Sequence, residues 1–157
     1  MEDNKVLQRI NSRFFQLYLL RHLPLAFFAG VNPKYVNFNE AEINMKFRWI
    51  NQNPFGSIYF AALCMGGEFS TGIIAQALIL DSKVKVSMLL LNIEANFIKK
   101  AKGLVVFKCT DGKSINSAIE RAIATKEGTE VTAYSEAKNE NGDVIATFRC
   151  KWAFRLK

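Results

Sequence analysis

The chain has 157 residues, 50% of them hydrophobic and thirteen of them Phe, and with no linker or repeat to divide it we expect one domain over residues 1–157. Its three cysteines are odd in number and widely spaced, and it has a single His, so the composition argues against a disulfide framework and against a metal site built on histidine. The net charge of +7 favours an anionic partner, but nucleic-acid binding would rest on this charge alone because no motif supports it.

An amphipathic helix is predicted at the start of the chain, from Asp3 to about Leu23, because apolar residues recur there at helical spacing with arginines opposite. The acidic start and the interior arginines argue against a signal peptide, and Pro24 ends the apolar run well short of a transmembrane span. We therefore expect a cytoplasmic protein without a transmembrane segment. The helix either covers the core of its own domain or lies on a membrane surface.

Two strands are predicted next, over Lys34–Asn39 and Glu42–Trp49. In the second, apolar residues alternate with polar ones, which is the pattern of a strand with one buried face. A loop over Asn51–Gly56 then leads into the most unusual part of the chain.

The stretch Asn53–Leu80 is apolar or small at nearly every position, and Glu68 is the only Asp, Glu, Lys, Arg or His in it. Gly56 breaks the preceding structure and Ser57 is a good N-cap, so a long helix is predicted to begin there. A helix that is apolar all round must be enclosed by protein. Burying a lone carboxylate costs several kcal/mol unless it is paired, hydrogen-bonded or shifted in pKa, so Glu68 is a candidate functional residue.

Small and hydroxylated residues surround Glu68 in this predicted helix. The interior glycines, Gly66, Gly67 and Gly72, indicate that a sheet or a ligand approaches the helix backbone closely. Ser70 and Thr71 are near enough in sequence to hydrogen-bond the Glu68 carboxylate, or they bond their own helix backbone.

The rest of the chain alternates between strands and one further helix. Val84–Ile98 is strand-like, and its residues Leu89, Leu91, Ile93, Ala95 and Phe97 are expected on one side. A basic turn follows, and then come a strand over Leu104–Thr110, a helix over Ser114–Lys126, and two strands over Thr129–Lys138 and Asp143–Leu156 joined by an Asn-Gly turn. A buried helix followed by long antiparallel strands predicts an α+β fold in which the sheet wraps the helix.

The chemistry available to this sequence is narrow. A catalytic triad is hard to assemble with one His, and neither a dinucleotide-binding nor a P-loop glycine motif occurs. What remains is a carboxylate working together with the N-terminus of the central helix. Backbone amides there can stabilise an oxyanion that develops on a substrate carbonyl.

The spacing of Asn53, Gly56, Tyr59 and Glu68 resembles the hot-dog fold thioesterase superfamily, in particular its phenylacetate-type acyl-CoA thioesterases and a related uncharacterised branch. In that family an Asn lies six residues before a His-Gly-Gly turn that opens the central helix, and an Asp or Glu follows the His by nine positions. Asn53 and Glu68 match both offsets, and Tyr59-Phe60-Ala61 stands in place of His-Gly-Gly. The resemblance covers most of the chain and implies a hot-dog fold with an extra N-terminal helix.

The resemblance implies hydrolysis of an acyl-CoA or related thioester. Glu68 would activate water or attack directly, Asn53 would orient the water or the carboxylate, and the Phe60 backbone amide would bind the oxyanion. Tyr59 occupies the His position, where packing is the commoner role for a Tyr. The alternative for Glu68 is a structural carboxylate paired with Arg or Lys across a dimer.

Two groups of residues are predicted to hold the substrate. The apolar residues that flank Glu68 are expected to form the acyl pocket: Met65, Phe69 and Ile73. The lysines of the basic turn either are simply solvated or, as the resemblance favours, attract the phosphates of coenzyme A: Lys99, Lys100 and Lys102. No cofactor is expected beyond the coenzyme A of the substrate.

The resemblance also implies a homodimer in which two sheets join edge to edge, and dimers of this kind can pair into tetramers. The two halves of the active site come from different subunits in the family. The alternative function is a non-catalytic dimer that binds an acyl chain or a lipid, in which the loss of His-Gly-Gly has closed the reaction site but kept the tunnel.

Overall fold

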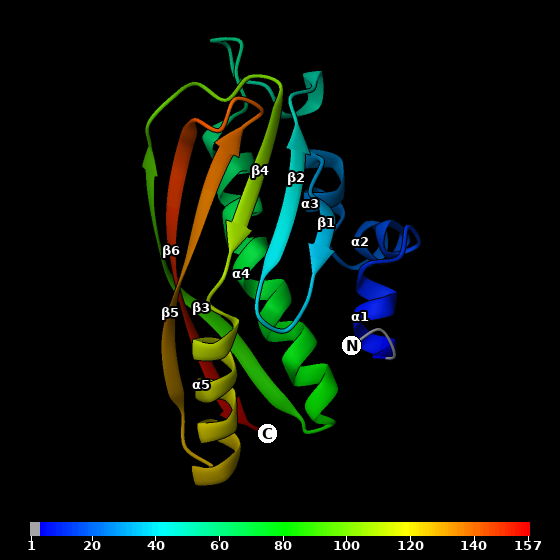
Figure 1. Cartoon of the computed structure of the whole chain (residues 1–157), viewed down its shortest axis with the longest axis vertical. Coiled ribbons are helices and arrows are strands. Elements are labelled where there is room, and N and C mark those ends of the chain that lie inside the picture. The colour runs from blue at the N-terminus through cyan, green and yellow to red at the C-terminus, as the bar shows by residue number, and fades with distance from the viewer. Residues whose placement is uncertain (1–3) are drawn as a thin grey trace.

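A computed structural model describes residues 4–157 of the chain, and Figure 1 shows its helices and strands. Three short helices come first, α1 (Lys5–Ile10), α2 (Phe15–His22) and α3 (Pro24–Ala29). Two strands and a 3-10 helix follow, β1 (Asn32–Val36), β2 (Ala41–Lys46) and η1 (Trp49–Asn51). The long helix α4 (Phe60–Ser82) leads into β3 (Val86–Phe97), β4 (Leu104–Cys109) and α5 (Gly112–Thr125). The last elements are the paired strands β5 (Thr129–Asn139) and β6 (Val144–Leu156).

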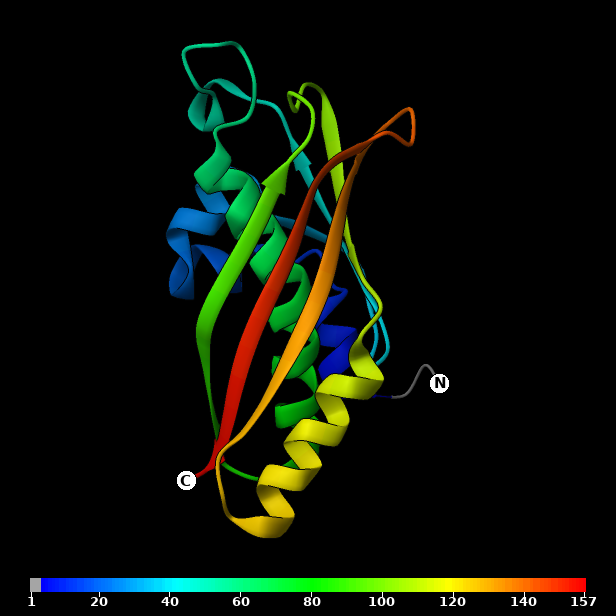
Figure 2. The same cartoon turned by 90° about the vertical axis from the view of Figure 1, so that its left-hand side faces the viewer.

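The strands form one six-stranded antiparallel sheet in the order β1-β2-β4-β5-β6-β3, so β1 and β3 are its edges. Helix α4 contacts β2, β4, β5 and β6 and runs along one face of the sheet, and α5 lies beside it (Figure 2). The N-terminal helices lie on the side of β1, away from β3 (Figure 1). This arrangement confirms the predicted α+β fold with an antiparallel sheet wrapped around a long central helix.

Helix α4 is the core of the domain. By length and composition it could cross a membrane, but 61% of its most apolar window is buried inside the protein, as expected for a core helix. A methyl group on Gly66 would lie 2.5 Å from the ring of Phe107 in β4, and one on Gly67 would overlap the ring of Phe148 in β6. Both rings are fully buried. The two glycines therefore let the helix backbone rest directly on aromatic side chains of the sheet.

The prediction of one continuous N-terminal helix over Asp3–Leu23 is wrong, and its first residue lies outside the described part of the chain. The break follows α1 at Asn11, whose side chain donates to the Val36 carbonyl at 2.7 Å and accepts from the Val36 amide at 2.8 Å. These bonds to β1 take the chain out of the helical path. Pro24 was expected to end the helical region, but it opens α3, where its missing N–H has no helical partner to lose.

The first strands are also shorter or shifted relative to the prediction. β1 starts at Asn32 and includes Pro33, which an edge strand tolerates. β2 ends at Lys46 because the buried Asn51 side chain accepts from the Arg48 amide at 2.9 Å and donates to the Lys46 carbonyl at 2.9 Å, which folds the next residues into η1. From β3 onward the predicted elements are confirmed, with boundaries moved by no more than two residues.

Strand β3 does not keep one face along its whole length, as the prediction assumed. Its pairing with β6 shifts register between Leu90 and Asn92, and this bulge turns the strand. Leu89 is 63% exposed and Leu91 is 45% exposed, whereas Ile93 is partly buried against the core. The edge strand therefore presents two leucines to the outside.

Candidate active site

Glu68 lies in the middle of α4, and its carboxyl group is largely enclosed by the protein. Burial raises the pKa of this carboxyl group from its ordinary value of 4.5 to about 7. Within residues 4–157 the carboxylate forms no hydrogen bond and no ion pair. A carboxyl group that titrates near neutrality can accept a proton from water and release it again, which is the property that a general base needs.

The neighbours of Glu68 come from its own helix and from β6. A methyl group on Gly72 would lie 3.2 Å from Glu68 Oε1 and 3.0 Å from Trp152 Cζ2, so Gly72 leaves room for both side chains. The Cys150 thiol is close enough for the charges of Glu68 and Cys64 to raise its pKa, although burial is the largest cause. The Glu68 side chain thus extends from α4 toward β6 and lies among apolar and sulfur-containing side chains.

Ser70 and Thr71 do not bind the Glu68 carboxylate. The Ser70 hydroxyl donates to the Gly67 carbonyl at 2.8 Å, and the Thr71 hydroxyl donates to the Glu68 backbone carbonyl at 2.8 Å. Thr71 Oγ1 also accepts from the Trp152 indole at 2.9 Å. Of the two predicted alternatives, bonding to the helix backbone is therefore confirmed, and the carboxylate remains available for chemistry.

The N-terminus of α4 is open. Its N-cap is Tyr59 rather than the predicted Ser57, and no side chain of residues 4–157 caps the helix. Within the described residues, the Phe60 amide has no hydrogen-bond partner. Amides of this kind at the positive end of a 23-residue helix can bind an anion or a developing oxyanion.

Asn53 organises the loop before α4. Its side chain donates to Ser57 Oγ at 3.0 Å and accepts from the amides of Phe55 at 2.9 Å and Ser57 at 3.3 Å. Ser57 is buried and held by Asn53, which explains why it does not serve as the N-cap. In this chain the Asn53 amide is engaged by its own loop.

A cavity of about 580 Å³ brings several predicted site residues together at the N-terminus of α4. Its lining includes Asn53, Tyr59, Phe60, Lys99 and Lys100. Glu68 and Lys102 do not line this cavity. The structure therefore assembles the predicted oxyanion region and two of the three lysines in one place, and the predicted carboxylate lies elsewhere in the same chain.

The two lysines in this cavity differ in what they contact. Lys99 forms an ion pair with Asp143 at 3.0 Å, and this pairing lowers the pKa of Asp143. The Lys100 ammonium lies 5.9 Å from the centre of the Phe55 ring. Within the described residues Lys100 has no carboxylate partner, so it is the freer of the two cations.

The predicted acyl-pocket residues lie mostly in the core. Phe69 is 6% exposed and Ile73 is 1% exposed, and both belong to the buried cluster that holds α4 in place. Met65 is partly buried at the edge of that cluster. None of these three lines the cavity at the N-terminus of α4.

Sequence reasoning did not identify Phe97 and Trp152 as parts of the site. The Phe60 ring lies 6.0 Å from that of Phe97, which in turn lies 6.1 Å from Phe148, so an aromatic chain runs from the cavity into the core. Trp152 is buried on the inner side of β6, along which buried and more exposed residues alternate. Its place beside Glu68 depends on how the sheet and helix are registered, which one sequence does not report.

The cysteines are all free. Cys109 and Cys150 are buried, and burial raises the pKa of Cys109 to about 12 and that of Cys150 to about 11, so both are neutral thiols near pH 7. Cys64 is partly buried. Across the described part of the chain, no group of three or more His, Cys, Asp or Glu side chains is arranged to hold a metal ion.

The chain is similar to one protein family and to several solved structures. The model of a family described as a domain of unknown function, DUF4442, matches residues 12–154. No curated protein sequence matches the chain. Among solved structures, a candidate thioesterase from Shewanella oneidensis is 11% identical and superposes with a TM-score of 0.77, covering 98% of this chain and 99% of that one.

Two further structures show the same fold. A Pseudomonas aeruginosa protein of unknown function, described as a thioesterase candidate, is 18% identical with a TM-score of 0.69, covering 97% of this chain and 94% of that one. A Gln-to-Ala variant of a thioesterase enzyme from Staphylococcus aureus is 19% identical with a TM-score of 0.60, covering 88% of this chain and 98% of that one. The same Staphylococcus protein was also solved as a Glu-to-Ala variant.

Proposed function

Because the chain belongs to the DUF4442 family and has the hot-dog fold of the thioesterase superfamily, we propose that it hydrolyses acyl-CoA or a related thioester, with Glu68 as the catalytic carboxylate. The observation that carries this proposal is Glu68 itself. It is the only carboxylate in the apolar part of α4, since Asp81 lies at the exposed C-terminal end of that helix. The pKa of Glu68 is about 7, and no described residue pairs with it. Such a group destabilises the fold when ionised, so its presence is best explained by chemistry.

A second observation supports the choice of Glu68. In the Staphylococcus aureus thioesterase, the two residues that were changed to alanine are a Gln and a Glu fifteen positions apart. Asn53 and Glu68 have the same separation in this chain. An amide followed at that distance by a carboxylate supports paired roles for these two residues.

The reaction requires an oxyanion site and a base on opposite sides of one thioester carbonyl. The carbonyl oxygen would lie at the Phe60 amide, where the helix end stabilises the negative charge of the tetrahedral intermediate. Glu68 would take a proton from a water that attacks the carbonyl carbon, and the C–S bond would break as the departing thiolate takes up a proton. Direct attack by Glu68 would instead form an anhydride that water then hydrolyses.

The Glu68 carboxylate and the Phe60 amide are distant from each other within one chain, which supports a site shared by two subunits. Glu68 follows Phe60 by eight residues, or about 12 Å along the helix axis, and it does not line the cavity at the N-terminus of α4. A homodimer would bring Glu68 of one subunit to the helix N-terminus of the other. Strand β3, an edge strand with exposed leucines, is the proposed dimer interface. Association of dimers into a tetramer stays a prediction.

The experiment is hydrolysis of a panel of acyl-CoA thioesters by the wild-type protein and by Glu68→Gln. Gln keeps the size and hydrogen-bonding reach of the side chain but cannot accept the proton, so we expect the rate to fall by about 10² or more. Glu120→Gln, an exposed carboxylate of α5, is the matched control and should keep full activity. Equal rates in the wild type and in Glu68→Gln would reject Glu68 as the catalytic group.

A non-catalytic acyl or lipid binder is the second candidate, favoured by Tyr59 and Phe60 in place of His-Gly. Tyr59 is 46% exposed and Phe60 is 54% exposed, and their rings contact each other edge to face with ring centres 4.8 Å apart. Saturable acyl-CoA binding without hydrolysis of any thioester in the panel would favour this function. A cytoplasmic location and the absence of a nucleic-acid partner stay predictions.

A further inference from the structure

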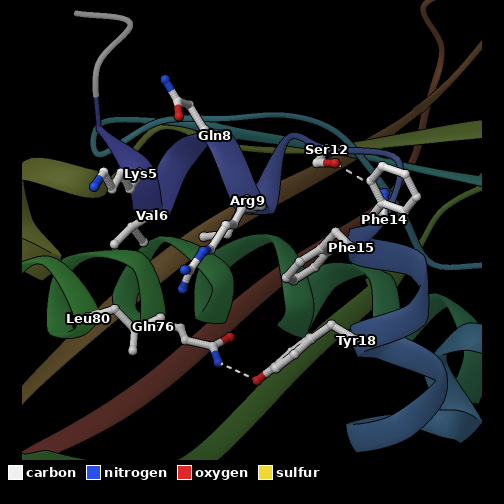
Figure 3. Close-up of a pocket in the computed structure, with 11 residues that line it drawn as sticks. Lys5, Val6, Gln8, Arg9, Ser12, Phe14, Phe15, Tyr18, Gln76 and Leu80 are labelled. Carbon is white, nitrogen blue, oxygen red and sulfur yellow. Dashed lines mark hydrogen bonds between the residues drawn. The ribbon is translucent and has the colours of Figure 1, made fainter.

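A second and larger cavity, of about 900 Å³, lies between α1, α2 and α4. Figure 3 shows α1 on one side, α4 on the other, and α2 closing one end. On α4 it is lined by Gln76, which follows Glu68 by eight residues, about 12 Å along the helix. Its volume is in the range of small-molecule sites, about 300–1,000 Å³. It is therefore a site apart from the proposed thioester chemistry.

The inner wall of this cavity is apolar. Ile10 is 4% exposed and Phe15 is 9% exposed, and Val6 and Leu80 extend the apolar surface along α1 and α4. The Phe15 ring stacks on Tyr18 with ring centres 5.1 Å apart. A wall of this kind favours an aliphatic or aromatic chain over a polar molecule.

One polar pair is set into the apolar wall. Gln76 Nε2 donates to the Tyr18 hydroxyl oxygen at 2.8 Å, a bond that Figure 3 shows across the gap between α2 and α4. Because the Tyr18 oxygen accepts this bond, its own O–H proton is left to donate. A carboxylate is an acceptor only, so it is the natural partner of that proton.

The charged side chains among the described residues that line the cavity are both basic. Lys5 and Arg9 line it, and neither forms an ion pair within the described part of the chain. Figure 3 shows the Arg9 side chain directed from α1 toward α4. Among residues 4–157 no Asp or Glu lines the cavity, and the sequence has none from residue 4 to residue 39. Asp81 of α4, which accepts a hydrogen bond from Asn4 at 2.6 Å, adjoins one end of the cavity without lining it. The charges on the lining itself favour an anionic group.

We propose that this cavity binds an amphiphile whose apolar chain lies along Val6, Ile10, Phe15 and Leu80 and whose anionic head group is held by Arg9 and the Tyr18 hydroxyl. A medium-chain carboxylate is the simplest such molecule. The proposal does not rest on thioester hydrolysis, because none of these residues belongs to the proposed catalytic site. An anionic membrane lipid has the same chemistry, and the test separates the two sources.

The first measurement is isothermal titration of the wild-type protein with dodecanoate below its micellar concentration and with dodecanol. Both ligands offer the same chain, but only dodecanoate offers the charge. We expect saturable binding of dodecanoate and binding of dodecanol weaker by about tenfold or more, since hydrogen bonds to a charged group are stronger than those to a neutral one. Equal affinities for the two ligands would overturn the role of the cation and the hydroxyl.

The second measurement assigns the binding to the cavity. Arg9→Gln and Tyr18→Phe should each weaken the binding of dodecanoate about tenfold and the binding of dodecanol by a smaller factor, because dodecanol carries no charge. The matched controls are Arg121→Gln on α5 and Tyr134→Phe on β5, which remove an exposed guanidinium and an exposed hydroxyl elsewhere and should bind as the wild type does. Unchanged dodecanoate affinity in both cavity variants, or equal weakening in the controls, would overturn the proposal.

Two further variants complete the assignment. Val6→Trp fills the cavity and should abolish binding of both ligands, provided that its melting temperature shows a folded protein. Glu68→Gln should bind dodecanoate normally, whereas loss of binding there would assign the ligand to the catalytic region instead. For the lipid source, sedimentation with phosphatidylglycerol vesicles that Arg9→Gln weakens and dodecanoate competes away supports the same cavity. Vesicle binding without saturable dodecanoate binding contradicts it.

Discussion

The charge state of Glu68 couples the proposed chemistry to the stability of the fold. A pKa of about 7 means that the folded protein holds this proton more tightly than the unfolded chain, whose carboxyl group has the ordinary value of 4.5. The protonated form is therefore the one that the folded state prefers. Its contribution to stability is complete below pH 4.5 and is lost as the pH rises through about 7.

This linkage gives a prediction for Glu68→Gln that needs no substrate. Between pH 4.5 and pH 8 the wild-type free energy of unfolding should fall by on the order of 3 kcal/mol because of this one group, and the variant should lack that fall. Urea unfolding of both proteins across this pH range measures the difference. Glu68→Gln should therefore be more stable than the wild type at pH 8, and the two proteins should have nearly equal free energies of unfolding at pH 4.5.

The structural alternative for Glu68 predicts the opposite sign. If a cation of a second subunit paired with the carboxylate, removing the charge would leave that cation buried without a partner and destabilise the dimer by about 3–5 kcal/mol. Glu68→Gln would then be the less stable protein at pH 8. A less stable variant with unchanged hydrolysis would end the catalytic assignment.

At the scale of single elements, α4 and the sheet are joined by close contact between glycines and rings. Ala is the better helix former by about 1 kcal/mol, so Gly67→Ala would stabilise an isolated helix. In the protein the added methyl group overlaps the Phe148 ring, which is fully buried in the core. Overpacking of this kind costs about 1–3 kcal/mol, which outweighs the gain in propensity.

We therefore expect Gly67→Ala to lower the melting temperature by several degrees, given about 2–4 °C per kcal/mol for a chain of this size. Gly128→Ala is the control, because a methyl group there meets nothing within 4 Å. Adding Phe148→Leu to Gly67→Ala should destabilise the protein by less than the sum of the two single changes, since the smaller side chain makes room for the methyl group. A melting temperature of Gly67→Ala at or above that of the wild type would refute this packing argument.

The elements also show where sequence reasoning succeeds and where it fails. The long central helix, α5 and the alternating β6 follow from local periodicity and were predicted with small boundary errors. The break at Asn11 depends on hydrogen bonds to Val36, 25 residues away, and the outward turn of Leu91 depends on a bulge against β6. Such features come from tertiary partners that no local pattern records.

In the candidate site, too, some features follow from the local sequence and others depend on tertiary contacts. Glu68 was identified because a charge in an apolar helix is visible in the sequence itself, and the grouping of Asn53, Tyr59 and Phe60 follows from their being neighbours in the chain. The engagement of Asn53 by Ser57, and the nearness of Trp152 to Glu68, required the folded backbone. Residues joined only by sheet register are the ones that sequence reasoning missed.

At the scale of the whole molecule, the proposed active site is complete only if two subunits pair through the edge strand β3. β3 pairs with β6 on one side, and it ends the sheet on the other. A 12-residue edge with Leu89 and Leu91 facing outward is a template for pairing with a second copy of itself, since proteins that avoid such pairing place charges there. An isologous pairing of two β3 strands would make one continuous sheet of two subunits.

The corresponding prediction is that light scattering of the wild-type protein gives twice the 17.8 kDa mass of one chain. Leu89→Asp combined with Leu91→Asp should yield the single-chain mass, because like charges would face each other across the pairing line. Tyr134→Asp, an exposed change within β5, should leave the dimer intact. If the active site is shared, thioester hydrolysis should disappear together with the dimer while circular dichroism stays unchanged. A monomeric double variant that retains full activity would show instead that one chain contains a complete site.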